Sequence, residues 1–293
     1  MNDRKLVLVT GATGHQGGAV ARRLLNRGFA VRAATRNPSS AAAKKLSSIG
    51  CEVVRADYDE ATSLERVLGD VWGVYSVQSL DQGTKVEEER GIRLAELAKR
   101  AGIETFVYSS VASADRDTGI PHFDSKLRIE ERIRALGFER AIVVRPVFFM
   151  ENLIAPTTLK DGKLMSLVPL DRKLQMVSAD DIGRFVAYAF AHSKDLAGDA
   201  IDIAGDEVTF REVASILGKA FKTSITPVRV PLDDVRKMSP DMAAMAEWFD
   251  RVGYDVDIRE LERSTGMRFS TLMEWAAKQT PPKKKAQATH AHA

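Results

Sequence analysis

Short apolar runs alternate with amphipathic stretches through the first half of this 293-residue chain. The apolar runs predict strands that are covered on both faces, as in the run Ala141 to Val144. The amphipathic stretches repeat apolar residues at helical spacing and predict helices. We expect strands near residues 6–10, 29–34, 51–56, 72–77, 105–109 and 140–145, and helices near residues 15–27, 40–48, 61–68, 86–101 and 123–136. Such repetition predicts an α/β fold with a doubly wound parallel sheet.

The pattern loosens after Pro146, where Pro156, Gly162 and Pro169 interrupt it. Three pairs of residues resemble capping boxes, in which a hydroxyl side chain and an acid three residues later satisfy the first N–H groups of a helix. The pairs are Ser178 with Asp181, Thr209 with Glu212, and Thr271 with Glu274, and they predict helices near residues 179–191, 210–221 and 272–278. Residues 200–204 and 226–230 are strand-like. The second half therefore predicts a smaller, loop-rich C-terminal lobe over the carboxyl edge of the sheet, where open α/β folds bind substrates.

Composition narrows the class of protein. The 43 basic and 40 acidic residues give a net charge of +3, which leaves no basic excess for direct binding of nucleic acid. Cys51 is the only cysteine, so a disulfide framework and a thiolate metal cluster are excluded. No apolar run reaches the ~18 residues that a membrane span needs, and the N-terminal residues lack a secretory segment. We expect a cytoplasmic protein with no membrane partner.

Histidine spacing gives no sign of a metal site. His192, His290 and His292 have no carboxylate or second histidine at ligand spacing, so no metal is expected. The last two lie in a tail that also contains lysines at 283–285, and we expect this tail to be a disordered, solvated end.

The stretch of residues 11–18 follows the first apolar run and has glycines spaced G-x-x-G-x-x-G at Gly11, Gly14 and Gly17. The first allows a sharp turn out of the strand, the second lets backbone N–H groups approach a pyrophosphate, and the third lets the next helix pack closely. A phosphate would then lie at a helix N-terminus, which attracts anions. No Gly-Lys-Ser/Thr follows, which excludes a nucleoside-triphosphate P-loop. We expect a dinucleotide to be bound by Gly11, Ala12, Thr13, Gly14, His15, Gln16 and Gly17.

The end of the second predicted strand indicates which dinucleotide. An NAD-specific site usually has Asp or Glu there to bind the ribose hydroxyls, whereas this chain has Arg36. A guanidinium can instead bind the 2′-phosphate of NADP(H), although an ordinary surface arginine is the competing interpretation. Asp57, at the end of the third strand with Tyr58 beside it, is placed to border the adenine, or is an exposed loop acid.

Together these features predict a division of the chain into three parts. We expect residues 1–150 to form an NADP(H)-binding Rossmann-type domain. Residues 151–279 should form a mixed C-terminal lobe that completes the sheet and covers the cleft for substrate and nicotinamide. Residues 280–293 should form the disordered tail.

Four segments resemble the NmrA-like family, which is related to the short-chain dehydrogenases and reductases. They are Gly11 to Gly18, Thr35-Arg36-Asn37-Pro38, His122-Phe123-Asp124-Ser125-Lys126, and Arg145-Pro146-Val147-Phe148-Phe149-Met150-Glu151-Asn152. The resemblance covers residues 4 to about 278. It implies a Rossmann-type domain that binds NADP(H), with Lys126 near the nicotinamide ribose. It also implies that Val77 and Gln78 line the cofactor and that the nicotinamide pocket is flanked by Phe149, Met150, Glu151 and Asn152.

One departure concerns the catalytic residue. The better-known reductases of this superfamily have Tyr four residues before the Lys, and here that position is His122. Spacing of i, i+4 puts His122 and Lys126 on one helix face, so we expect the nearby cation to keep the imidazole neutral. A catalytic role and a structural role at a helix N-terminus remain open for His122. Ser109 and Ser110, at the end of the fifth strand, are candidates to polarise a carbonyl, or they cap a helix or form a turn.

The chain has the residues expected to bind the cofactor but lacks the catalytic tyrosine, and two functions fit this combination. The first is an NADP(H)-binding redox sensor or regulator, with weak or no catalysis, that a regulatory protein partner or a second copy of the chain reads. The second is an NADPH-dependent oxidoreductase that transfers a hydride to a quinone, an enone or a similar small apolar acceptor. Such acceptors delocalise negative charge and need less from a proton donor. The absent tyrosine favours the sensor.

Overall fold

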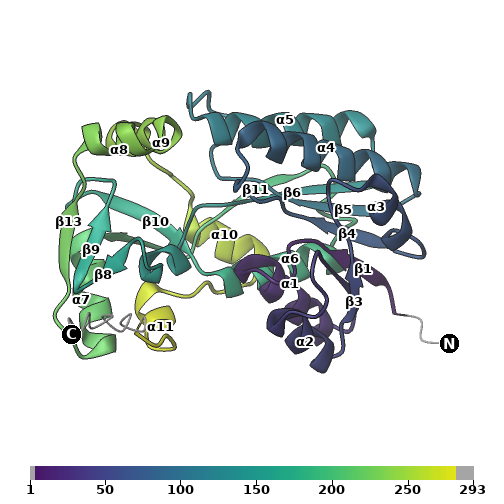
Figure 1. The fold of residues 1–293 in the computed structure, drawn as a ribbon, viewed down its shortest axis with the longest axis horizontal. Coiled ribbons are helices and arrows are strands. Elements are labelled where there is room, and N and C mark those ends of the chain that lie inside the picture. The colour runs from purple at the N-terminus through teal and green to yellow at the C-terminus, as the bar shows by residue number, and fades with distance from the viewer. Residues whose placement is uncertain (1–3, 282–293) are drawn as a thin grey trace, which may run out of the picture.

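A computed structural model describes residues 4–281 and places a parallel sheet at the centre of the N-terminal half (Figure 1). Its seven strands lie in the order β11-β6-β5-β4-β1-β2-β3, and neighbouring strands run parallel. The strands are β1 (Leu6–Val9), β2 (Ala30–Thr35), β3 (Glu52–Arg55), β4 (Gly73–Ser76), β5 (Thr105–Ser109), β6 (Arg140–Pro146) and β11 (Ala200–Ile203). The chain runs outward from β1 to β3 and then crosses to β4, which leaves a switch point between β1 and β4. Ligands of open α/β sheets bind at such points.

Helices cover both faces of this sheet (Figure 1). One layer contains α1 (His15–Asn26), α2 (Ala41–Ser48) and α6 (Ala179–Ala191), and the other contains α3 (Ala61–Val67), α4 (Thr84–Arg100) and α5 (Pro121–Leu136). Alternate residues of β1 enter the two layers, because Val7 and Val9 belong to the apolar core with α1 and α6, and Leu8 belongs to the core with α4 and α5. The expected Rossmann-type, doubly wound α/β fold is thereby confirmed.

The second half of the chain returns to the main sheet through α6 and β11 and otherwise builds mainly a smaller lobe to one side of it (Figure 1). The lobe has two small sheets, made of β7 (Phe148–Phe149), β10 (Lys173–Val177) and β12 (Asp206–Thr209), and of β8 (Leu159–Lys160), β9 (Lys163–Ser166) and β13 (Thr226–Arg229). Its helices are the 3-10 helix η1 (Met150–Ile154), α7 (Phe210–Phe221), α8 (Leu232–Met238), α9 (Pro240–Arg251) and α11 (Leu272–Ala276). The helix α10 (Ile258–Thr265) packs instead against the core that the main sheet forms with α1 and α6. The helices expected from the three capping pairs correspond to α6, α7 and α11, and the strand-like runs correspond to β11 and β13.

Several elements of the second half were expected to be loops. Asp161 and Gly162 have φ of 50° and 75° and form the two-residue turn of a hairpin, in which Lys160 pairs with Lys163. The strands on either side are too short to show alternation, so Gly162 looked like an interruption. The pattern also missed α8, α9 and α10. A cap marks the start of α9, where the hydroxyl of Ser239 accepts a hydrogen bond from the N–H of Met242.

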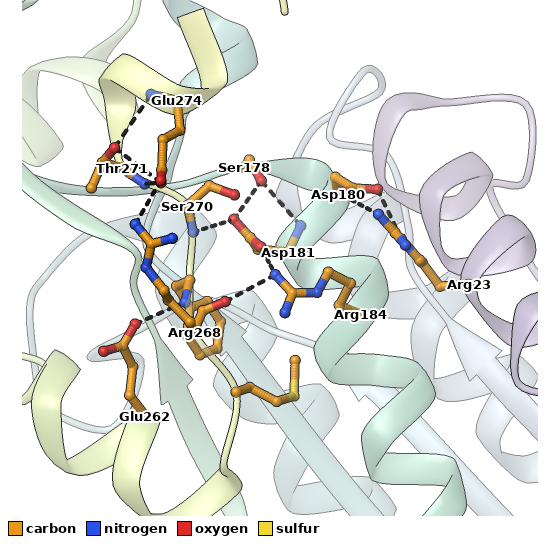
Figure 2. Close-up of polar contacts among 12 residues, drawn as sticks. Arg23, Ser178, Asp180, Asp181, Arg184, Glu262, Arg268, Ser270, Thr271 and Glu274 are labelled. Carbon is orange, nitrogen blue, oxygen red and sulfur yellow. Dashed lines mark hydrogen bonds and ion pairs between the residues drawn. The ribbon is translucent and has the colours of Figure 1, made fainter.

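Polar contacts fasten the C-terminal segment to α6, as Figure 2 shows. Asp181, fully buried in the first turn of α6, accepts hydrogen bonds from the backbone N–H of Ser270 at 3.0 Å and from Arg184 at 2.8 Å. α6 in turn packs closely on α1, since a Cβ added to Gly183 would lie 2.7 Å from the carbonyl carbon of Ala19. The C-terminal segment is thus joined, through α6, to the helix that follows the glycine-rich turn.

The expected disordered tail, residues 280–293, lies almost wholly outside the described residues, which end at 281. Among residues 4–281, no helix combines the length and the apolar character that crossing a membrane requires.

Candidate functional site

A cavity of about 580 Å³ is lined by residues that follow the carboxyl ends of β1, β2, β3 and β4. It therefore lies at the switch point of the sheet. The sequence-predicted residues that line it are Gly11, Thr13, Gly14, His15, Gln16, Gly17, Arg36, Asp57, Tyr58, Val77, Gln78 and Phe149. The cavity brings together the glycine loop (residues 11–17), the arginine at the end of β2, the pair after β3, the residues after β4 and one aromatic residue of β7.

The glycine loop has the backbone geometry of a phosphate cradle. Gly11 has φ of 59°, a region that side chains disfavour, and its carbonyl accepts a hydrogen bond from the N–H of Gly14 at 2.9 Å. A Cβ on Gly17 would lie 2.3 Å from the oxygen of Gly11, so only glycine fits there. α1 begins next to this loop without a side-chain cap on its first N–H groups. Those N–H groups and the helix dipole can bind an anion.

Thr10 fixes the loop to the neighbouring strand. Its hydroxyl donates to the carbonyl of Tyr75 at 3.0 Å and accepts from the N–H of Val77 at 3.0 Å. The ends of β1 and β4 are thereby held together below the cavity. Thr10 carries no distinguishing signal in the sequence, because a threonine at the end of a strand is common.

The part of the cavity beyond β2 and β3 is bordered by an arginine on one side and by a fixed loop on the other. Arg36 lines it as an exposed side chain at the end of β2. Arg90 of α4, which sequence analysis missed, is 5 % exposed and donates to both carboxylate oxygens of Asp59 at 3.0 and 2.6 Å. It ties α4 to the loop that carries Asp57 and Tyr58. The exposed cation can bind an anionic group, and the fixed loop beside it can border a planar base.

Tyr58 and Gln78 supply polar groups to the wall. The hydroxyl of Tyr58 donates to the carbonyl of Val77 at 2.8 Å, and burial raises its pKa to about 12, so it stays a neutral donor. Gln78 donates to the hydroxyls of Ser76 and Tyr58 at 2.9 and 3.3 Å. Its Oε1 is buried without a hydrogen-bond partner among the described residues. An unpaired buried acceptor is costly, so this atom fits a ligand that donates a hydrogen bond into the cavity.

Four predicted residues do not line the cavity. Ala12 is buried beneath the loop, Met150 is fully buried in the apolar core of the C-terminal lobe, and Asn152 is exposed. The carboxylate of Glu151 accepts from the N–H of Ala179 at 3.0 Å and from the indole of Trp275 at 3.1 Å. It therefore joins η1 to α6 and α11. Burial is the largest influence on Glu151 and raises the pKa of its carboxyl.

Lys126 also lies outside the residues that line the cavity. Its Nζ donates to Oε1 of Glu87 in α4 at 2.7 Å, and the hydroxyl of Ser125 donates to the other oxygen at 2.9 Å. Glu87 is 1 % exposed and Lys126 is 14 % exposed, so this is a largely buried ion pair between α4 and α5. Glu87 lies one helical turn before Arg90 in α4, and Arg90 does line the cavity. Glu87 carries no sequence signal that links it to Lys126.

The charged group that faces His122 differs from the expected one. Nδ1 of His122 lies 2.7 Å from Oδ2 of Asp241, in the first turn of α9, while Lys126 is bound to Glu87. Burial raises the pKa of the Asp241 carboxyl, but the hydrogen bond and the charge of His122 outweigh it and hold that pKa below its ordinary value. The structure thus places a carboxylate, and not the ammonium of Lys126, against Nδ1 of His122. The protonation state expected for His122 from the sequence stays a prediction.

The two serines after β5 have different surroundings. Ser109 is hydrogen-bonded to the amide of Gln16 in the glycine loop, so it braces the loop. The hydroxyl of Ser110 is buried and has no partner among the described residues. Within residues 4–281, no group of three or more His, Cys, Asp or Glu side chains is arranged to hold a metal ion.

Known proteins resemble nearly the whole chain. A family model described as the NmrA-like family matches residues 3–280. An NmrA-like family domain-containing protein of Dictyostelium discoideum is 26 % identical over 267 residues, 85 % of this chain and 88 % of that one. An NmrA-like family domain-containing oxidoreductase of Penicillium ochrochloron is 36 % identical over 164 residues, 52 % of this chain and 49 % of that one. The match thus spans about half the length of that relative.

Solved structures share the fold. An NADPH-dependent quinone oxidoreductase of Escherichia coli, complexed with NADPH, superposes with a TM-score of 0.78 at 24 % identity and covers 93 % of this chain and 98 % of that one. NmrA, a negative transcriptional regulator in complex with NAD, has a TM-score of 0.78 at 18 % identity, with 94 % and 95 % covered. At these identities the likeness concerns the fold.

Proposed function

The chain belongs to the NmrA-like family, and on that premise we propose that it binds NADP(H) in the cavity and uses NADPH to reduce a small conjugated acceptor, such as a quinone or an enone. The observation that carries the proposal is the cavity itself, with the glycine loop at the switch point of the sheet and Arg36 at the end of β2. In this proposal the backbone of the loop binds the pyrophosphate and Arg36 binds the 2′-phosphate. NADPH bound there supplies a hydride.

The remaining cofactor contacts follow the order of the strands. Asp57 and Tyr58, after β3, would border the adenine. Val77 and Gln78, after β4, and Phe149, in β7, would lie along the rest of the cofactor, with the unpaired oxygen of Gln78 accepting a hydrogen bond. Met150 and Glu151 would support this wall from behind through the core and α6.

The acceptor class follows from what the site lacks. His122 occupies the position where related reductases have Tyr, so the proton donor that reduces a simple ketone is absent. A quinone or an enone spreads the developing negative charge over several atoms and depends less on such a donor. Relatives named as oxidoreductases and a quinone oxidoreductase of the same fold support this choice.

A second candidate function is a redox sensor, which one observation favours. The ammonium of Lys126 is bound to Glu87, and this ion pair leaves the lysine less available to orient a cofactor ribose. In that case the protein binds NADP(H) and catalyses little or no turnover. A protein partner or a second copy of the chain then recognises the cofactor-bound state. Regulation then requires two conformations that differ in affinity for the cofactor.

One experiment separates the two. The purified protein is mixed with NADPH and a panel of quinones and enones, and loss of NADPH absorbance is followed beside a binding titration. Turnover that Lys126→Ala abolishes, while Lys85→Ala on the exposed face of α4 leaves it unchanged, supports the reductase. Tight binding with no turnover across the panel removes the reductase and leaves the sensor.

A further inference from the structure

We propose that Arg90 sets the preference for NADPH over NADH, because its guanidinium neutralises Asp59 and thereby leaves Arg36 free for the 2′-phosphate. This inference rests on the proposed binding of NADP(H) in the cavity and deepens it, and it applies to a reductase and a sensor alike. Arg90 belongs to α4 and Asp59 to the loop between β3 and α3, so neither is next to Arg36 in the chain. Arg90 is a positioning residue, which acts on the phosphate through two other side chains.

Carboxylates surround the part of the cavity where Arg36 lies. Asp57 and Asp81 line the cavity, and Asp59 lies two residues after the first of them. The hydrogen bond from Arg90 is the largest of the influences that hold the pKa of the Asp59 carboxyl below its ordinary value, and the nearby charge of Arg36 also contributes. An ionised carboxylate in this place attracts the guanidinium of Arg36 and repels a bound phosphate.

Arg90 holds the carboxylate of Asp59 in a bidentate contact. Its Nε and one terminal nitrogen donate to the two carboxylate oxygens at 3.0 and 2.6 Å. The same terminal nitrogen donates to the amide oxygen of Gln82 at 3.2 Å, and the other lies 3.9 Å from the carboxylate of Asp81. Arg90 is 5 % exposed, so the guanidinium is fixed in this position. Both oxygens of Asp59 are therefore committed to Arg90.

This pairing leaves Arg36 without a competing partner. The Arg36 side chain is exposed, lines the cavity and makes no ion pair or hydrogen bond with any of residues 4–281. A guanidinium that is not paired within the protein can bind a phosphate at two points. The contact between Asp59 and Arg90 thus keeps Arg36 available for the 2′-phosphate.

The other nearby cation does not replace Arg90. Arg93, in the next turn of α4, lies 3.9 Å from Asp59, but its hydrogen bond goes to the backbone carbonyl of Tyr58 at 2.7 Å. Without Arg90, the charge of Asp59 is left to Arg93 and Arg36 alone. The carboxylate then draws Arg36 away from the phosphate and repels the phosphate directly.

The test compares the affinities for NADPH and NADH by calorimetric titration of the full chain. Arg90→Met removes the charge and nearly keeps the length of the side chain. We expect the affinity for NADPH to fall about tenfold and that for NADH to change by less than about threefold. Because the two cofactors differ only in the 2′-phosphate, a variant that merely distorts the cavity weakens both alike. An unchanged ratio of the two affinities overturns the inference.

Removal of the carboxylate separates this mechanism from direct contact between Arg90 and the phosphate. Asp59→Asn in the Arg90→Met background should restore most of the preference for NADPH, because the unpaired negative charge is gone. A double variant with no more preference than Arg90→Met shows direct contact or support of the loop, and overturns the inference. Asp59→Asn alone should keep or increase the preference. A loss of preference there overturns the inference even if Arg90→Met fails to fold.

Arg55→Met is the matched control. Arg55 donates to both oxygens of Glu60 at 2.9 and 2.8 Å, in an exposed pair that borders the same loop, and neither residue lines the cavity. This variant should leave both affinities unchanged, and equal effects of the two arginine substitutions contradict a specific role for Arg90. Absence of NADPH binding by the wild type removes the proposed function and this inference together. Binding by the wild type with an unaltered preference in Arg90→Met removes the inference alone.

Discussion

The phosphate end and the acceptor end of the proposed site are built from different kinds of contact. At the phosphate end, the backbone of the glycine loop makes the site, and side chains such as Thr10 only hold it in place. The acceptor end is the start of α5, where we propose that the acceptor binds and where side chains from distant segments meet in pairs, Lys126 with Glu87 and His122 with Asp241. These four residues do not line the cavity itself. Backbone geometry tolerates almost no substitution, whereas a pair of side chains can be exchanged as a pair while the fold persists. We therefore expect the phosphate end to decide binding and the acceptor end to decide turnover.

The largest effect should come from the phosphate end. Gly17→Ala adds a Cβ that would lie 2.3 Å from the oxygen of Gly11. The loop must shift, and we expect NADPH affinity to fall about 100-fold or more, measured by calorimetric titration. Gly18→Ala is the matched control, because its Cβ would lie 3.1 Å from the oxygen of Ala12 and needs only a small adjustment. Equal affinities in the two variants would contradict the cradle.

The next effect should be selective between cofactors. Arg36→Asp removes the guanidinium from the cavity and introduces a carboxylate, which repels a phosphate and can bind ribose hydroxyls. We expect the affinity for NADPH to fall about 10- to 100-fold and that for NADH to change little or improve. Arg66→Asp, on the exposed side of α3, serves as the control for net charge. Equal losses for the two cofactors would refute a 2′-phosphate site at Arg36.

A change at the acceptor end should spare binding. Glu87→Gln keeps the shape of the side chain but removes the charge that holds the ammonium of Lys126. We expect kcat with a quinone to fall about tenfold while the dissociation constant of NADPH changes by less than about threefold. Glu88→Gln, which breaks the more exposed pair with Arg128, should alter neither quantity. A loss of NADPH binding equal to the loss of kcat would erase the proposed division between the two ends.

The smallest effect concerns stability around the loop after β5. Asp202 accepts a hydrogen bond from the N–H of Ser113, and burial raises the pKa of its carboxyl to about 6. Because the folded pKa lies above the unfolded one, this group favours folding below about pH 4, and that contribution is lost as pH rises through about 6. We subtract the Tm of the wild type from that of Asp202→Asn at each pH. This difference should be a few degrees larger at pH 8 than at pH 4.5. A gap in Tm that is the same at both pH values would contradict the raised pKa.

The same contrast explains what could be predicted from the sequence. The glycine loop and Arg36 sit next to strands in the chain, so local pattern located them, and the covered strands located the sheet. Asp241 and Glu87 meet their partners across 119 and 39 residues, and nothing in the local pattern joins them. Thr10 and Arg90 act through hydrogen bonds to a neighbouring strand and loop, which also leave no pattern. Short elements such as the hairpin at Asp161 escaped because two to four residues are too few to show a period.

The most direct test of the central claim is a calorimetric titration of the wild-type protein with NADPH and with NADH under the same conditions. The claim is that this one cavity binds NADP(H) through the glycine loop and Arg36. We expect one NADPH per chain, bound about tenfold or more tightly than NADH. Equal affinity for the two cofactors, or no binding of NADPH at millimolar concentration, would contradict the account.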